Sequence, residues 1–471
     1  MTLTSASPGR VSRLLRRGAL LAAAPCLAAG PLAAQSAGSA PPATAQQRAQ
    51  GAGGARATVR AATPTQAPVP VGTIRGRITA GPDSLIVSLL TIGPGEQLFD
   101  RFGHSSIRVR NDAIGLDSAW NWGMYDFESA GFIWRFLTGD TRYWMAGFPS
   151  PLLVDFYHRA HRAVWEQELN LSRPEADSLL AFLRWNAQPE HRFYRYDYYL
   201  DNCSTRVRDA IDAVTGGALQ RTMRGATKGV TWRGETLRLA EAFPTIAFGM
   251  TFALGPRADA ILTQWEEAFV PMRLRDALRD VRVSGPGGPE PLVRAERVLA
   301  PEGPWAEASA PPRYAAPAAV IGLAVGVLLL LLRRAGPPVA SRAVIGACGS
   351  VWHLVVGIAG TLVLLAGLFT RHQFMAANAS VLLGTPASLA LAVLYVRAWS
   401  PRASGRTRRA GVALCVVAAV CAAVALLVHA APAWSPEDLF RLFPNLARMP
   451  GRSGGAMSGG EQQMLTVART L

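Results

Sequence analysis

The sequence predicts an α+β extracytoplasmic domain, residues 73–280, followed by an all-α region of four transmembrane helices, residues 315–431. Three features predict this organisation. Short β-prone runs and amphipathic helical runs alternate in the first region. The second region contains apolar segments of about 20 residues, the length that spans a bilayer. A positively charged and then apolar N-terminal segment predicts export of the region that follows.

The first 34 residues have the pattern of a secretory signal peptide. Ala19 to Leu27 form its apolar core, and the small residues Ala33 and Ala34 offer a cleavage site. The charged segment before the core contains Arg10, Arg13, Arg16 and Arg17. An uncleaved membrane anchor is the alternative interpretation. Residues 35–72 are rich in Ala, Pro, Gln, Gly and Thr without periodicity, which predicts a disordered linker.

The chain is strongly basic, with a formal net charge of +16, and Lys228 is its only lysine. The scarcity of lysine favours coding bias as the main cause of this charge. Arginines cluster beside the apolar segments, which favours an anionic membrane surface over nucleic acid as the basic chain's partner. We therefore expect no nucleic-acid partner.

The loops between the apolar segments predict the topology. The first and third loops carry almost all of the arginines, whereas the second has only Arg371 beside His372. The positive-inside rule places the first and third loops in the cytoplasm, so the soluble domain lies outside. We expect a multi-pass protein of the bacterial inner (cytoplasmic) membrane with a periplasmic domain. The four segments are Ala315–Leu332, Val344–Phe369, Met375–Val396 and Gly411–Ala430.

Cys203 is the one cysteine of the predicted soluble domain. The other four lie in the signal segment or the apolar segments, namely Cys26, Cys348, Cys415 and Cys421. Cys203 therefore has no local disulfide partner in an oxidising compartment. A buried structural cysteine is the ordinary interpretation. The polar neighbours Asn202, Ser204 and Thr205 argue against it.

The residues after Cys203 predict a helix that begins at or near it. An aromatic run, residues 196–199, precedes Cys203, and apolar residues then recur at helical spacing, at Val207, Ala210, Ile211 and Val214. A helix N-terminus favours the thiolate through its dipole and its free backbone N–H groups. Cys203 is therefore the candidate nucleophile.

His104 is the candidate base for this thiol. Ile107 and Val109 alternate with arginines after it, which predicts that His104 starts a half-buried strand. Residues 119–125 predict the next strand, and Asn121 on that strand could orient the imidazole. An adjacent imidazole is the usual means of activating a thiol. A structural role for the histidine is the alternative.

Other segments carry less specific signals. Residues 127–142 are aromatic and predict a wall of the site, a membrane-facing surface or ordinary core. Ser172 and Glu175 predict a capped start for a helix that runs to Trp185. Residues 281–314, rich in Pro, Gly and Glu, predict a linker. No metal site and no cofactor are expected, since His158, His161 and His191 lack metal-ligand spacing.

The region from about Ser84 to Leu278 resembles the Lnb N-terminal periplasmic domain family. The matching motifs are TIGPGEQLFDRFGHSSIRV, NWGMYDF, EQELNLS and YDYYLDNCSTRVRD, in the order the family has them. The resemblance implies a circularly permuted papain-like (NlpC-type) fold, similar to lecithin:retinol acyltransferase-like proteins. It also implies that Cys203 is the nucleophile and His104 the base. Asn121 as the third member follows only from its strand position.

The activity that the resemblance implies is N-acylation of lipoproteins. The Cys203 thiolate would take an acyl chain from a phospholipid, and the N-terminal amine of a lipoprotein would then attack the thioester. Backbone N–H groups at the start of the helix would bind the oxyanion. A cysteine amidase that cleaves cell-wall peptides with the same dyad stays open, as does a binding module without catalytic activity.

The C-terminal segment, residues 432–471, does not fit this scheme. Its last part, SGGAMSGGEQQMLTVARTL, resembles the signature region of an ABC-transporter ATPase. No Gly-Lys-Ser or Gly-Lys-Thr occurs in the chain, so no P-loop accompanies it. We interpret the segment as a fused fragment without ATPase function.

Overall fold

The computed structural model describes residues 85–335, 338–400 and 402–430. All of them belong to one compact unit. The predicted signal peptide, the predicted linker 35–72 and the predicted ABC-type fragment lie outside the described residues.

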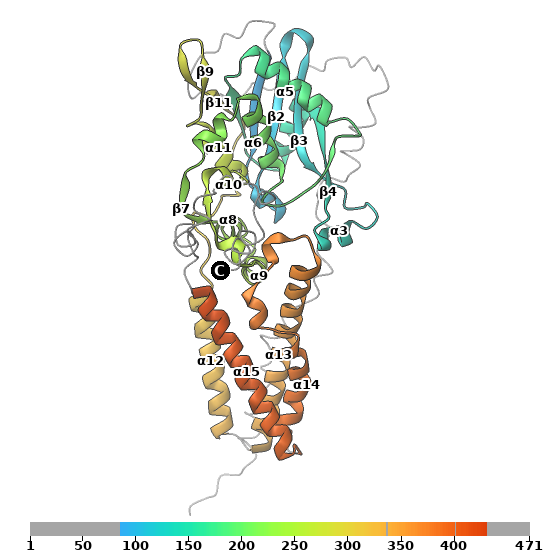
Figure 1. Cartoon of the computed structure of the whole chain (residues 1–471), viewed down its shortest axis with the longest axis vertical. Helices are drawn as coiled ribbons and strands as arrows, with labels where there is room; N and C mark the ends of the chain where they lie inside the picture. The colour runs from blue at the N-terminus through green and yellow to red at the C-terminus, as the bar shows by residue number, and fades with distance from the viewer. Residues whose placement is uncertain (1–84, 336–337, 401, 431–471) are drawn as a thin grey trace, which may run out of the picture. The chain divides into compact units, whose positions relative to one another are not determined.

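Seven antiparallel strands form the central sheet, in the order β11-β5-β1-β2-β3-β4-β6 (Figure 1). Strand β1 is buried along nearly its whole length, which explains its almost uninterrupted apolar sequence. The strands are β1 (Ile86–Ile92), β2 (His104–Asn111), β3 (Leu116–Met124), β4 (Arg142–Pro149), β5 (Val164–Leu169), β6 (Phe193–Arg195) and β11 (Val293–Ala300). The short helices η3 (Phe99–Phe102) and η4 (Asp112–Ile114) flank β2.

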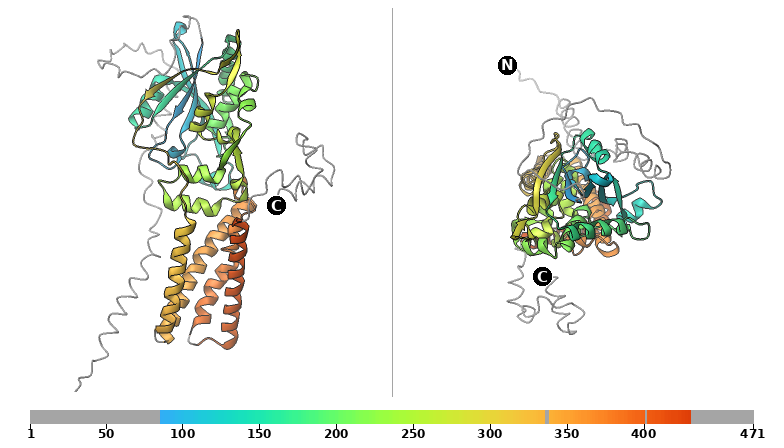
Figure 2. Two further views of the ribbon diagram at one scale, coloured as in Figure 1. Left: turned by 90° about the vertical axis from the view of Figure 1, so that its left-hand side faces the viewer. Right: turned by 90° about the horizontal axis from the view of Figure 1, so that it is seen from above.

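Helices cover both faces of this sheet (Figure 2). The main core joins one face to α5 (Arg173–Asn186), α6 (Cys203–Val214), α7 (Ala218–Thr222) and α11 (Pro271–Leu278). A smaller core joins the other face to α4 (Ser150–Arg159). Helix α5 begins with the predicted capping box, in which the Ser172 N–H donates to Glu175 Oε2 at 2.7 Å. The mixed α/β architecture is confirmed, whereas the permuted papain-like arrangement stays an expectation.

A second cluster of helices has its own apolar core. Its elements are β7 (Ala226–Thr231), α8 (Trp232–Leu239), α9 (Pro244–Ala253), η5 (Pro256–Asp259), β8 (Ile261–Thr263) and α10 (Gln264–Glu267). Strands β7 and β8 pair with each other. The core of this cluster is aromatic, with Tyr199, Trp232 and Phe269 in edge or tilted contact. Tyr199 comes from the segment just before Cys203, so the cluster supports the start of α6.

The predicted linker at residues 281–314 is wrong over its first part. Strands β9 (Arg282–Gly285) and β10 (Gly288–Pro291) form a hairpin, and β11 pairs with β5 at the edge of the sheet. Arg297 on β11 forms ion pairs with Glu166 and Glu168 on β5, at 3.9 and 3.1 Å. The composition of the segment suggests a linker, but its charged residues have partners 129 positions away that local sequence does not reveal.

Four helices follow that are long and apolar enough to cross a membrane. Three of them are α12 (Ala315–Ala335), α13 (Pro338–Phe369) and α15 (Gly405–Ala430), and the remaining candidate span is Ala379–Trp399, which includes α14 (Ala387–Trp399). The third predicted segment, Met375–Val396, is not one continuous helix. Two short helices, η6 (Gln373–Met375) and η7 (Ala379–Leu382), precede α14, which begins after Pro386. Proline lacks a backbone N–H, so the helix starts there instead of continuing through it.

The loop between α13 and α14 packs against the mixed α/β region. Phe374 is buried in the aromatic core of the second helical cluster. Its carbonyl accepts a hydrogen bond from the Gly255 N–H at 2.6 Å, and Asn378 Nδ2 donates to the carbonyls of Phe252 and Ala253. The loop therefore lies on the same side as the soluble domain, in agreement with the predicted topology.

Replacing Phe374 by alanine should destabilise the domain, because Phe374 lies in the loop between α13 and α14 and packs in the aromatic core of the second helical cluster. We expect Phe374→Ala to lower the free energy of unfolding by about 3–5 kcal/mol, since a large buried aromatic side chain is lost. Urea-dependent pulse proteolysis of the detergent-solubilised protein would measure this. The control is Phe369→Ala, because Phe369 is 75% exposed at the end of α13. Equal urea midpoints for the two variants would contradict docking of the loop.

Candidate active site

Cys203 is the first residue of α6, as the sequence pattern predicts. Asn202 caps the helix, since its Oδ1 accepts the N–H groups of Ser204 and Thr205 at 2.8 and 2.9 Å. Thr205 Oγ1 in turn accepts the Asn202 N–H at 2.8 Å. This reciprocal capping box defines where the helix starts. It therefore fixes the backbone position of the thiol.

The same cap limits the expected oxyanion site. Two of the N–H groups in the first turn, those of Ser204 and Thr205, already donate to Asn202. They are not available to a substrate oxygen without breaking the cap. The expectation that several N–H groups at the helix start bind the oxyanion is therefore corrected. The Cys203 N–H is the first-turn donor that this cap does not use.

His104 begins β2 and lies beside Asn121 of β3. The ring atom Nε2 is 3.1 Å from Asn121 Oδ1. Asn121 Nδ2 donates to the Ala119 carbonyl at 3.1 Å, which orients the amide so that its oxygen faces the ring. Because that oxygen can only accept, Nε2 carries the proton of the neutral imidazole. Nδ1 is then the basic nitrogen, as a general base requires.

The start of α6 lies against the same end of β2 and β3. The N–H of Ser105, the residue after His104, acts to lower the pKa of the Cys203 thiol. A Cβ built on Gly123 of β3 would lie 3.6 Å from the Cys203 Cβ. Gly123 has φ +90, a conformation that favours glycine, and lies at the register shift between Asn121 and Met124. The structure thus brings all three predicted site residues to one end of the β2–β3 hairpin.

Burial controls the charge state of the thiol and the imidazole. It raises the pKa of Cys203, and the N–H groups of Ser105, Ser204 and Cys203 oppose this effect only in part. Burial also lowers the pKa of His104 to about 4, although the bond to Asn121 raises it. Both groups are neutral near pH 7. The expectation that the helix N-terminus favours a resting thiolate is therefore wrong, because desolvation outweighs the helix terminus.

Arg162, between α4 and β5, is a charged neighbour of the site that no sequence pattern indicates. Its Nε donates to the Gly93 carbonyl at 3.0 Å, and its Nη1 contacts Asp100 Oδ1 at 2.5 Å. Its positive charge acts to lower the pKa of both His104 and Cys203. Through its hydrogen bonds to Gly93 and Asp100, Arg162 links the segment after β1 to the short helix η3 before His104. Its neighbours in sequence carry no motif, so only the fold reveals this position.

A set of ring contacts leads from the segment before Cys203 to β4 and the loop after β3. We call Tyr125, Phe132, Tyr143, Tyr196 and Tyr198 the aromatic wall. Neighbouring ring centroids in it are between 4.4 and 6.2 Å apart. Burial raises the pKa of Tyr125 to about 12, and that of Tyr196 well above its ordinary value. These phenols stay neutral, so the wall is poor in charge.

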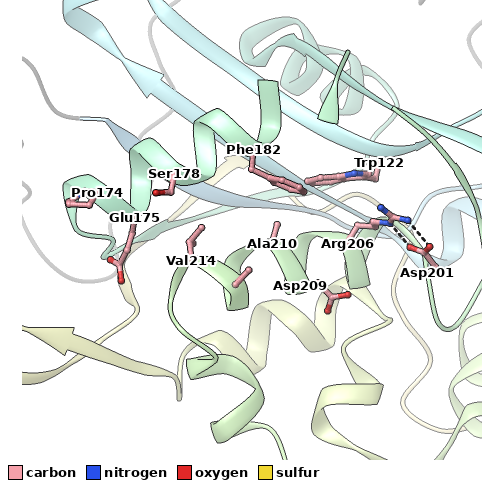
Figure 3. A pocket seen from close by; sticks show the side chains of 11 residues that line it. Trp122, Pro174, Glu175, Ser178, Phe182, Asp201, Arg206, Asp209, Ala210 and Val214 are labelled. Carbon is pink, nitrogen blue, oxygen red and sulfur yellow. Dashed lines mark hydrogen bonds and ion pairs between the residues drawn. The ribbon is translucent and has the colours of Figure 1, made fainter. Parts of the chain in front are cut away.

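A surface pocket of about 670 Å³ lies on the other side of α6, between α6 and α5 (Figure 3). Trp122 and Phe182 lie side by side along it. Arg206 and Asp201 form an ion pair at its edge, with a shortest distance of 2.5 Å. None of the three predicted site residues lines this pocket. Two of its lining residues adjoin the site in sequence, since Trp122 follows Asn121 on β3 and Arg206 lies about one turn along α6 from Cys203.

His158, His161 and His191 are exposed. His158 is on α4, His161 follows that helix, and the His191 ring stacks on Trp185 at 4.2 Å between centroids. In the part of the chain that the structure describes, no group of three or more His, Cys, Asp or Glu side chains could hold a metal ion.

The neutral resting state makes thiol alkylation strongly pH-dependent. We expect the rate at which iodoacetamide modifies Cys203 to rise continuously from pH 6 to pH 9, because the raised pKa leaves the thiol mainly protonated throughout that range. Peptide mass spectrometry of Cys203, with the urea-unfolded protein as reference, would measure the rate. A rate that is already at its plateau at pH 7 would mean a resting thiolate instead.

Residues 78–236 match the family model described as the Lnb N-terminal periplasmic domain. No curated protein and no solved structure matches the chain significantly. The matched segment includes His104, Asn121 and Cys203 and ends inside α8, so α9 to β11 lie beyond it. The chain is thus similar to this family over residues 78–236, and together with the four apolar helices the match fits a membrane protein with a periplasmic domain.

Proposed function

We propose that the protein is a membrane-anchored cysteine acyltransferase that moves an acyl chain from a phospholipid to the N-terminal amine of a lipoprotein. The observation that carries the proposal is that the capped Cys203 lies by the start of β2, where the Ser105 N–H acts on its thiol and the preceding residue, His104, is hydrogen-bonded to Asn121. This hydrogen bond keeps the proton of the neutral imidazole on Nε2. Nδ1 is then free to act as the base for the thiol. We place the protein in the inner membrane with this site in the periplasm.

In the first half-reaction, Nδ1 of His104 takes the proton of the thiol while the sulfur attacks the ester carbonyl of the phospholipid. A C–S bond forms, and the carbonyl carbon becomes tetrahedral. The C–O bond to the glycerol then breaks, and the leaving alkoxide takes the proton back from the imidazolium. The products are a thioester on Cys203 and a lysophospholipid. Because both groups start neutral, no buried ion pair has to be maintained before the substrate arrives.

In the second half-reaction, the free amine of the lipoprotein attacks the thioester carbonyl. His104 accepts the amine proton, a C–N bond forms, and the C–S bond breaks. The thiolate that leaves takes the proton from His104, which restores the neutral pair. The Cys203 N–H supports the oxyanion in both half-reactions. An acyl chain packed on the uncharged aromatic wall would exclude water from the thioester, which favours aminolysis over hydrolysis.

The intact mass of the membrane-purified protein tests the covalent intermediate. After incubation with phospholipid vesicles, we expect an adduct of acyl size that hydroxylamine removes, as it does for thioesters. Cys203→Ser should show no adduct, and the control Cys348→Ser should show the same adduct as the wild type. If the wild type forms no adduct and cleaves peptidoglycan fragments instead, the enzyme is an amidase that uses the same dyad.

Substitutions at His104 and Asn121 test the assigned roles. We expect His104→Ala to slow thioester formation by about 10²–10⁴-fold, the contribution of a positioned general base. Asn121→Ala should slow it less, because the imidazole stays present but can adopt the other tautomer. Single-turnover kinetics would measure both rates, with His158→Ala on the outer surface of α4 as the control. Equal rates for His104→Ala and His158→Ala would remove His104 from the mechanism.

A further inference from the structure

The short helix α3 (Phe132–Thr138) presents large apolar side chains to its surroundings. Trp134 is 70% exposed, Ile133 65% and Leu137 56%. Glycines with positive φ, Gly131 and Gly139, flank the helix at both ends and delimit it as a separate projecting turn. Contiguous exposed apolar groups of this kind indicate a surface that meets another apolar phase.

Contacts at the end of α3 place it beside the end of a membrane helix. The Arg371 N–H donates to the Thr138 carbonyl at 2.8 Å, and the Arg371 side chain pairs with Asp140 at 2.8 Å. His372 Nε2 is 3.0 Å from the Phe136 carbonyl. Arg371 follows Phe369, the last residue of α13, by two positions. Two residues span at most about 7–8 Å, so α3 lies at the depth where the apolar span ends.

A second helix, α9, lies near the same depth. Its Phe248 ring, 53% exposed, contacts the Tyr314 ring at 5.7 Å between centroids. Tyr314 directly precedes the first residue of α12. Two exposed apolar helices of the domain therefore adjoin the ends of two different membrane spans. Tryptophan and tyrosine favour this interfacial region, and arginine fits the headgroup layer.

We propose that α3 inserts the side chains of Ile133, Trp134 and Leu137 into the lipid leaflet on the domain side of the membrane. The occupant of this surface is lipid, because the hydrogen bond from Arg371 to Thr138 makes the surface continuous with the lipid-facing end of α13. A soluble protein partner would have to enter the headgroup layer to reach it. The inserted helix holds the site at the bilayer surface.

The aromatic wall connects this surface with Cys203. The Phe136 ring of α3 contacts the Tyr198 ring at 6.2 Å between centroids, and Tyr198 contacts Tyr196 at 5.8 Å. A Cβ on Gly123 would lie 3.8 Å from Tyr196 and 3.6 Å from Cys203. An acyl chain that leaves the leaflet at α3 would thus contact uncharged aromatic rings along its whole path to the Cys203 thiol. This consequence rests on the proposed acyl transfer, whereas the insertion of α3 does not.

A depth measurement tests the insertion without any activity. Trp134→Cys is labelled with the environment-sensitive dye NBD in the full chain, whose five native cysteines are replaced by serine, and the protein is reconstituted in phosphatidylcholine vesicles. We expect blue-shifted NBD emission that brominated phosphatidylcholine quenches at least twofold. The control is Ile114→Cys, since Ile114 is 69% exposed on η4, at the opposite end of β2 from His104. Water-like, unquenched emission at position 134, equal to that at 114, would overturn the proposal.

A kinetic experiment tests the consequence for the substrate. The double variant Trp134→Glu/Leu137→Glu should form the Cys203 thioester from vesicle phospholipid at least tenfold more slowly than the Ile114→Glu control. Its rate of iodoacetamide labelling at Cys203 should stay unchanged, which shows that the site is folded. Equal thioester rates for the two variants would show that α3 does not supply the acyl chain. A wild type that forms no thioester refutes the proposed function, while the NBD result still decides the insertion.

Discussion

The hydrogen bonds of Asn202 cap α6 and hold its start against two other parts of the fold. Its Oδ1 accepts two N–H groups of α6, and its Nδ2 donates to the carbonyls of Tyr198 and Phe269. The side chain is buried, so each of its polar atoms needs a partner within the protein. An aspartate has no donors for the two carbonyls, and a serine has too few. The position of the thiol therefore depends on an amide at residue 202.

Desolvation decides the chemistry that this geometry supports. The thiol and the imidazole are both buried and both neutral, and Arg162 adds a positive charge nearby. A neutral pair in a water-poor site exchanges its proton only as the new bond forms. Such a thiol is protected from nonspecific oxidation in an oxidising compartment, since the thiolate is the reactive form. The arrangement suits a nucleophile that reacts with a bound substrate and not with solutes in general.

The membrane region is part of the domain's structure as well as its anchor. The loop between α13 and α14 supplies Phe374 to an aromatic core that also contains Tyr199, four residues before Cys203. The same loop binds the end of α3 through Arg371. The position of the site relative to the bilayer is thus determined by packed side chains and hydrogen bonds. A flexible tether alone would leave this position undefined.

Local patterns in the sequence determined the element types, the start of α6 at Cys203, the strands that carry His104 and Asn121, and the four apolar helices. Each of these depends on periodicity or capping over a few residues, which the chain displays directly. Only the tertiary structure decided that β11 joins the sheet, that Phe374 enters a core, and that Arg162 faces the site. Those features depend on residues far apart in sequence. The direction of the Cys203 pKa shift also followed from the tertiary structure, because burial is a property of all the neighbours of a group, whereas a helix start is a property of the few residues around it.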